Sequence, residues 1–382
     1  MSSNKVRIDD IEVLRAFAII FVIMHHFNGG FSRFETGSFV NQFYSYFNGS
    51  VGVDLFFGIS GFVIARSLLP SLWACTDATG RRQTIYSFWI RRMSRLFPAA
   101  WLWLGLILVF QVFFNDSNVF GNLKENLWST VAGVFQFANV RLANAFINES
   151  GYGASFVYWS LSLEEQFYFV FPLLALLPKR WLIAALAVII AYQLFSPRSI
   201  WEMMFRTDAL CSGALLAIMH ESKACQRFLN FLRGRALVLT VLFPVLLCIL
   251  VVSSSDSYKI IFNYYSGDYY SFYYYSVVTV VAFLIVLIAS LNIDLARRII
   301  PFHGVFMWIG SRSYGLYLIH VPLNFVIREF CFNLGIGVSN YLIPLTLLNI
   351  VLLGVIAQLN FTWIEQPFRK RGAAFAREKF DS

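Results

Sequence analysis

An arginine and a histidine stand eleven positions apart inside the first long apolar stretch of the sequence, which reads IEVLRAFAIIFVIMHHF. Because an α-helix turns about 100° per residue, Arg15 and His26 fall within about 20° of each other around the axis, separated by about 16 Å of rise. His25 points about 80° away from them. Ionisable side chains are costly inside a membrane helix and by default mark a functional site. His26 is therefore a candidate general base or transient acyl carrier, and Arg15 is a candidate catalytic cation.

A group of arginines precedes the third apolar stretch, at the end of SFWIRRMSRLFP. We expect residues 66–95 to form an inner-face loop in which Arg92 and Arg95 share one helical face, with Arg91 beside them. Guanidinium groups bind phosphate oxygens in bidentate fashion, so this group favours an anionic ligand. Positive-inside anchoring near phospholipid headgroups is the alternative.

Two adjacent carboxylates open a later apolar stretch, YWSLSLEEQFYFVFPLL. Ser160, Glu164 and Tyr168 follow one another at intervals of four residues and share a face, whereas Glu165 points about 100° away. Burying an unpaired carboxylate costs several kcal/mol, so one of the two acids could pair with an arginine of another helix. We expect Glu164 to act at the site and Glu165 to have a separate role.

Further polar residues interrupt other apolar stretches. In GVDLFFGISGFVIA, the glycines indicate close helix packing, and Asp54 is either solvated or reaches a histidine of the first stretch. In SRSYGLYLIHVPL, Ser313, Tyr317 and His320 share a face, and His320 is structural or lines a site. In FRTDALCSGALLA, two opposite charges could offset each other or contribute to an outer cavity. The candidate substrate-binding residues are Asp54, Glu165, Tyr168, Tyr317, His320, Arg206 and Asp208.

Eight tyrosines gather within residues 258–275. An interfacial aromatic belt is the ordinary explanation, and a sugar-stacking platform on the outer face is the alternative.

The composition identifies the class of protein that must position these residues. The chain is 58% hydrophobic and 13% charged, against roughly 25% charged residues in soluble domains. We therefore expect an all-α, polytopic integral membrane protein. The five cysteines are scattered without metal-ligand spacing, which argues against a metal site, and the net charge of +9 follows topology, which argues against a nucleic-acid partner.

About ten membrane-spanning helices are expected, because apolar windows of about twenty residues begin near residues 11, 51, 96, 158, 181, 205, 236, 272, 302 and 341. An even number places both termini on one side of the membrane. With that side cytoplasmic, 23 of the 30 Lys and Arg residues lie inside and 7 outside, as the positive-inside rule requires. Residues 116–157 are too interrupted to count as a span and are expected to be external or re-entrant.

Together these segments resemble the membrane-bound acyltransferase-3 family, which moves acyl groups, most often acetyl, onto extracytoplasmic glycans and related acceptors. The resemblance runs nearly end to end, through LRAFAIIFVIMHHF, GVDLFFGISGFVI, RRMSRLFP, WSLSLEEQFYFVFP, SYGLYLIHVPL and IEQPFR. It implies a transmembrane acyltransferase domain over residues 1–372 and a short basic cytoplasmic tail over 373–382. It also implies a bacterial cytoplasmic (inner) membrane location.

The resemblance further implies a mechanism. Cytoplasmic acetyl-CoA, or another acyl-CoA such as succinyl-CoA, would bind Arg92 and Arg95 through its phosphates and present its thioester near His26. Glu164 would orient the imidazole, and an extracytoplasmic glycan or glycolipid would receive the acyl group. Some relatives append an extracytoplasmic hydrolase-like domain; without one here, we expect the membrane domain or a separate partner to complete the transfer.

Two other classes of function fit the sequence. One is a transporter or flippase for a lipid-linked sugar or acyl compound, and the other is a sensor or assembly protein that keeps the scaffold without catalysis. The acceptor and the oligomeric state are not identified by the sequence.

Overall fold

The computed structural model describes residues 8–30, 39–253, 255 and 272–380. Within these ranges the chain is helical and has no β-strand, which confirms the predicted all-α fold. The first half contains α1 (Asp9–Gly30), α2 (Phe39–Tyr46), η1 (Gly49–Val51), α3 (Gly52–Ala74), α4 (Ala78–Phe113), α5 (Leu123–Val134), α6 (Ala138–Ile147), α7 (Tyr158–Leu174) and α8 (Lys179–Phe195). The second half contains α9 (Ile200–Met204), α10 (Asp208–His220), α11 (Lys223–Arg233), α12 (Ala236–Ser253), α14 (Phe272–Ser290), α15 (Leu295–Ile299), α16 (His303–Ser311), α17 (Ser313–Asn333), η2 (Val338–Tyr341), α18 (Leu342–Asn360), η3 (Phe361–Glu365) and α19 (Gln366–Phe380).

Several of these helices have the length and composition of membrane spans. Within the described chain there are five such segments: Gly49–Ala74, Ala78–Phe113, Ala236–Ser253, Ser313–Asn333 and Leu342–Phe380. They correspond to five of the ten expected spans and support an integral membrane protein. The 17 residues of α7 and of α8 extend about 26 Å, slightly less than the hydrocarbon thickness of about 30 Å.

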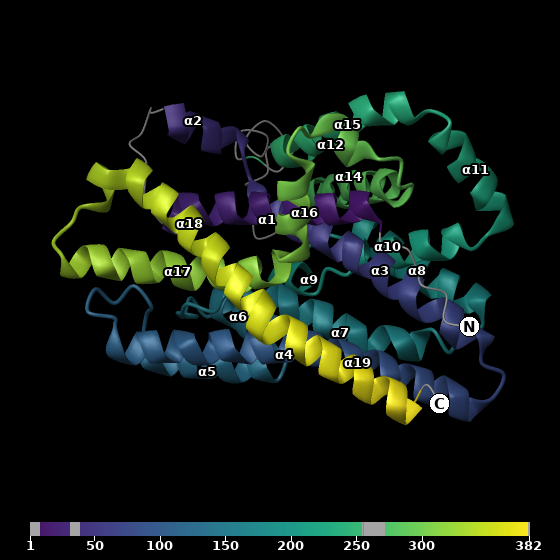
Figure 1. The fold of residues 1–382 in the computed structure, drawn as a ribbon, viewed down its shortest axis with the longest axis horizontal. Helices are drawn as coiled ribbons and strands as arrows, with labels where there is room; N and C mark the ends of the chain where they lie inside the picture. The colour runs from purple at the N-terminus through teal and green to yellow at the C-terminus, as the bar shows by residue number, and fades with distance from the viewer. Residues whose placement is uncertain (1–7, 31–38, 254, 256–271, 381–382) are drawn as a thin grey trace.

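The long axis of the molecule follows many of the helices, and α11 lies at one end of it (Figure 1). Helix α2 lies at the opposite end (Figure 1). Helices α1 and α3 form the centre: α1 contacts α3, α14, α16 and α17, and α3 contacts α4, α7, α10 and α14. The residues expected to carry chemistry are therefore gathered around these two helices.

Three boundaries differ from the sequence prediction. The expected loop over residues 66–95 is wrong, because α3 continues to Ala74 and α4 begins at Ala78 behind an Asp77 cap that accepts the N–H of Gly80 at 3.1 Å. Arginine is a good helix former, so α4 already includes the arginines that precede the apolar stretch, instead of beginning with that stretch. The late span begins at Ser313 instead of near residue 302, because the chain breaks between α16 and α17.

The structure also locates the C-terminal segment and residues 116–157. The expected domain boundary at residue 372 falls inside α19, which packs on α4 with Ala376 fully buried. Residues 116–157 contain α5 and α6, of 12 and 10 residues, which extend about 18 and 15 Å and are too short to span a bilayer.

Close packing of α3 on α10 confirms the predicted role of the small residues. A Cβ on Gly61 would lie 1.9 Å from the carbonyl oxygen of Leu210, and a Cβ on Gly213 would lie 2.0 Å from that of Gly58. A glycine at each of these contacts lets the two backbones approach this closely.

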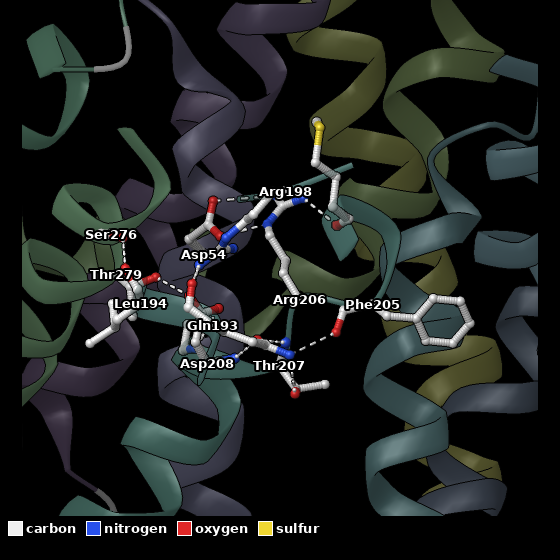
Figure 2. Close-up of polar contacts among 12 residues, drawn as sticks. Asp54, Gln193, Leu194, Arg198, Phe205, Arg206, Thr207, Asp208, Ser276 and Thr279 are labelled. Atoms are coloured by element: carbon white, nitrogen blue, oxygen red, sulfur yellow. Dashed lines mark hydrogen bonds and ion pairs between the residues drawn. The ribbon is translucent and has the colours of Figure 1, made fainter. Parts of the chain in front are cut away.

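A network of buried charged side chains joins α3, α10 and α14 (Figure 2). Arg206 of the α9–α10 connection forms two hydrogen bonds with Asp54 of α3, of 2.9 and 3.3 Å. Arg198 donates to Asp208 at 2.5 Å, and Thr279 of α14 donates to the same carboxylate at 2.7 Å. Arg206 and Asp208 thus make their direct ion pairs with other residues, Arg206 with Asp54 and Asp208 with Arg198.

We predict that Gly213→Val destabilises the protein, because its side chain would collide with the α3 backbone. Overpacking costs about 1–3 kcal/mol, and contact with a rigid backbone places this change at or above that range. The thermal unfolding midpoint in detergent measures the effect. Gly105→Val is the matched control, because a Cβ there meets nothing within 4 Å; equal midpoints for the two variants would contradict the prediction.

Asp208→Asn is expected to lower stability by about 3–5 kcal/mol, because it leaves the buried Arg198 without its carboxylate. Denaturation in detergent, followed by loss of monodisperse protein, measures this. Glu149→Gln changes an exposed carboxylate and should have no effect. A stable Asp208→Asn protein would show that the pair does not hold the helices together.

Candidate active site

The arginine-rich cavity, here called the Arg92 cavity, has a volume of about 70 Å³ and lies among α1, α3, α4, α7 and α17. This volume is below the range of most small-molecule sites, roughly 300–1,000 Å³. The polar residues that line it are Arg15, Ser60, Arg92, Arg95, Ser160, Glu164, Glu165, Tyr168, Ser313, Tyr314 and Tyr317. The structure thus brings together three arginines and two carboxylates that lie up to 150 residues apart in the sequence.

Glu164 is held by side chains of two helices. Its Oε1 accepts hydrogen bonds from the hydroxyls of Ser60 on α3 and Tyr168 on α7. The expected contact between Glu164 and the imidazole of His26 does not form, because these two hydroxyls bind the carboxylate instead. Glu164 therefore belongs to the wall of the Arg92 cavity.

The guanidinium of Arg92 is positioned by aromatic rings. Its Cζ lies 5.5 Å from the centre of the Tyr168 ring and 5.6 Å from that of Phe88. Cation–π contacts of this kind fix the plane of a guanidinium while its N–H groups remain directed outward along the plane. Arg92 is thereby ready to bind an anion.

The other predicted charges divide between the cavity and the surface. Arg15 lines the cavity and is paired with Glu12 at 2.6 Å. Glu164 and Glu165 leave α7 in different directions, yet both line the Arg92 cavity. This is possible because both α3 and α4 pack on α7. Arg91, predicted beside Arg92, is exposed, is absent from the cavity wall, and donates to Ser87 one turn away.

His26 is paired with a second histidine. Its Nδ1 lies 3.0 Å from the carbonyl oxygen of Val22 and 3.0 Å from Nε2 of His320 on α17. The Nδ1 of His320 lies 2.7 Å from the carbonyl oxygen of Tyr317, whose hydroxyl bonds Ser160 at 2.7 Å. His320 is 1% exposed, so its polar atoms depend on these partners.

A second cavity, here called the Arg206 cavity, has His25 in its wall and a volume of about 610 Å³. The Asp54–Arg206 pair lines it, so Asp54 meets an arginine and not the histidine considered from sequence. Aromatic and small polar residues complete the wall: His25, Asn48, Ser50, Tyr152, Phe156, Trp159 and Tyr275. Asp208 lines neither cavity, because Arg198 and Thr279 enclose it.

The histidine pair lies between the two cavities. The ring of His26 contacts those of His25 and Phe156, which line the Arg206 cavity, and that of His320, whose ring contacts Tyr317 of the Arg92 cavity. Helix α7 contributes neighbouring residues to the two walls, Trp159 to one and Ser160 to the other. Neither His26 nor His320 is itself part of either wall; both contact side chains that are.

Sequence reasoning missed several residues of this region. Ser60 is a hydroxyl residue within an apolar stretch of α3, and such a position could have been singled out as polar. Arg198 lies in a connection without any motif, and only its 2% exposure shows its importance. The tyrosine-rich stretch lies mostly outside the described residues; Tyr275, at its end, lines the Arg206 cavity, where the guanidinium of Arg206 lies 5.5 Å from its ring.

Comparison with known proteins agrees with this arrangement. The chain is 27% identical to the peptidoglycan O-acetyltransferase OatA of Listeria monocytogenes, over 96% of this chain and 56% of that protein. It is 25% identical to the O-acetyltransferase OatA of Staphylococcus aureus, over 95% and 57%, and 26% identical to the putative peptidoglycan O-acetyltransferase YrhL of Bacillus subtilis, over 98% and 57%. The chain therefore spans little more than half the length of these relatives.

No solved structure matches the chain significantly. The family model described as an acyltransferase domain, by contrast, matches residues 8–359. That range contains both cavities and the histidine pair between them. The chain belongs to the acyltransferase-3 family.

Proposed function

We propose that this protein is a membrane-bound O-acetyltransferase that moves an acetyl group from cytoplasmic acetyl-CoA to a hydroxyl of an extracytoplasmic glycan. The observation that carries the proposal is the position of His26, paired with His320, between a basic cavity and an aromatic, polar one. Membership of the acyltransferase-3 family and the O-acetyltransferase names of the relatives support the same reaction.

The Arg92 cavity is assigned to the acyl donor. Arg92 and Arg95 offer guanidinium groups that suit the phosphates of coenzyme A, and Arg15 adds a third cation. The rings beneath Arg92 hold its guanidinium in place, which reduces the entropy lost when an anion binds. The same chemistry would accept a succinyl donor, and acetyl is preferred because the relatives are named for acetyl transfer.

The reaction follows from a base beside an acyl thioester. His26 takes the proton of the acceptor hydroxyl while that oxygen attacks the thioester carbonyl carbon. The carbon–sulfur bond then breaks, and the sulfur leaves with the proton that His26 returns. The products are an acetyl ester and the free thiol of coenzyme A, so no oxidant or metal is needed to balance the reaction.

The Arg206 cavity is assigned to the acceptor. Trp159, Tyr152 and Tyr275 offer flat apolar faces, and Asn48 and Ser50 offer hydrogen-bonding groups, which together suit a sugar ring. Two relatives carry peptidoglycan in their names, so we propose a glycan of the cell envelope. The site would then lie in the cytoplasmic membrane of a bacterium.

We further propose ten spans with both termini in the cytoplasm. Helices α11 and α19, which carry many of the basic residues, lie toward the same end of the molecule (Figure 1). Those cations belong on the cytoplasmic side by the positive-inside rule. The Arg92 cavity would then open toward the donor.

Arg92→Ala is expected to lower kcat/KM for acetyl-CoA by about 10- to 100-fold, because it removes charge-assisted hydrogen bonds to phosphate. Transfer of radiolabelled acetyl to peptidoglycan glycan chains, by protein purified into liposomes, measures this. Arg91→Ala is the matched control: the residue is adjacent, equally charged and exposed. Equal losses from the two changes would rule out a specific donor site at Arg92.

His26→Gln is expected to lower kcat by about 10²–10⁴-fold, the contribution of a positioned general base. His25→Gln should mainly raise KM for the glycan, because His25 lines the acceptor cavity. The same liposome assay, with each substrate varied in turn, separates the effects. Full activity of His26→Gln would refute acyl transfer at this site and leave transport of unmodified substrate as the function to test.

A further inference from the structure

The hydrogen bonds around the histidine pair determine where its protons lie. Two of the partners are backbone carbonyl oxygens, of Val22 beside Nδ1 of His26 and of Tyr317 beside Nδ1 of His320. A carbonyl oxygen can only accept a hydrogen bond. Both Nδ1 atoms must therefore carry a hydrogen, since two lone pairs at 2.7–3.0 Å would repel each other.

The direction of the hydrogen bond between His26 and His320 follows from these assignments. In a neutral imidazole one nitrogen carries hydrogen and the other is an acceptor. Nε2 of His320 is thus the acceptor, and Nδ1–H of His26 donates to it across 3.0 Å while also facing Val22. The opposite direction would require a doubly protonated His320 at a residue that is 1% exposed, and burial disfavours that cation.

We infer that His320 is the positioning residue of the reaction: it holds His26 in the Nδ1–H tautomer, so that the lone pair of Nε2 is the base. Nε2 of His26 makes no hydrogen bond with any residue that the structure describes. It is therefore the nitrogen available to the acceptor hydroxyl.

The same contact acts during the proposed transfer. When Nε2 of His26 takes the hydroxyl proton, the ring becomes an imidazolium with hydrogen on both nitrogens. The Nδ1–H already points at the lone pair of His320, so the new charge meets an acceptor without any rearrangement, as a carboxylate provides in a catalytic triad. His320 thus takes the part that the sequence resemblance led us to expect of Glu164, which is bound by Ser60 and Tyr168.

The tautomer can be measured directly, without substrate. The chain has only five histidines, so the protein labelled with ¹⁵N-histidine and placed in lipid nanodiscs gives few imidazole signals, and protonated and unprotonated ring nitrogens resonate far apart. His26→Gln identifies the His26 signals by their loss. We expect a protonated Nδ1 and an unprotonated Nε2; a His26 protonated on Nε2 in the unaltered protein would overturn the inference.

Activity tests the role of His320, which rests on the proposed acyl transfer. His320→Leu removes the acceptor, so we expect kcat to fall about 10- to 100-fold with KM for acetyl-CoA nearly unchanged, and the Nε2–H tautomer of His26 to appear. In His320→Gln, the amide oxygen can accept in place of Nε2, so activity and tautomer should largely return. His220→Gln is the control, since that imidazole binds Ser290 on other helices.

The outcomes separate two kinds of failure. If the tautomer is as expected but no acetyl is transferred by the unaltered protein, the proposed function fails while the assigned protons stand. If acetyl is transferred and His320→Leu retains full kcat, or His320→Gln is as impaired as His320→Leu, the positioning role fails.

Discussion

The structure depends on one constraint: a charged or strongly polar side chain within a membrane helix must find its partner inside the protein, because lipid offers none. The pairs that result join different helices. Asp54 of α3 meets Arg206, Asp208 of α10 meets Arg198 and Thr279, and His26 of α1 meets His320 of α17. Each pair connects elements that are distant in sequence, so satisfying the charges also sets the arrangement of the helices.

This constraint also divides the interior. Helices α3 and α7 each contribute neighbouring side chains to two separate cavities, such as Val53 and Asp54 on α3. Close glycine packing of α3 on α10 keeps the backbones near enough for the Asp54–Arg206 pair to form. A single wall of helices can in this way place a cluster of arginines on one side and an aromatic, polar cavity on the other, with a titratable group between them.

Much of the site follows from local helical geometry, and the exceptions have a common cause. The shared face of Arg15 and His26, and that of Ser160, Glu164 and Tyr168, depend only on the helical period of about 3.6 residues. The direct partners that were not predicted, Asp54 for Arg206 and Ser60 for Glu164, required knowing which helices meet. The mistaken loop over 66–95 arose because apolar windows detect where lipid ends, whereas a helix of good formers such as arginine continues into water.

The sequence by itself determined the all-helical membrane class, the residue types that carry chemistry, and the face of each helix on which they lie, because hydropathy and helical period are local properties. Tertiary structure alone decided the partners. His26 and His320 are 294 positions apart in the sequence, and Ser60 and Glu164 are 104 positions apart. Only the packing of the helices brings the members of each pair into contact. Which nitrogen of His26 carries hydrogen depends on those distant contacts, since a ring nitrogen carries hydrogen according to the acceptor that faces it.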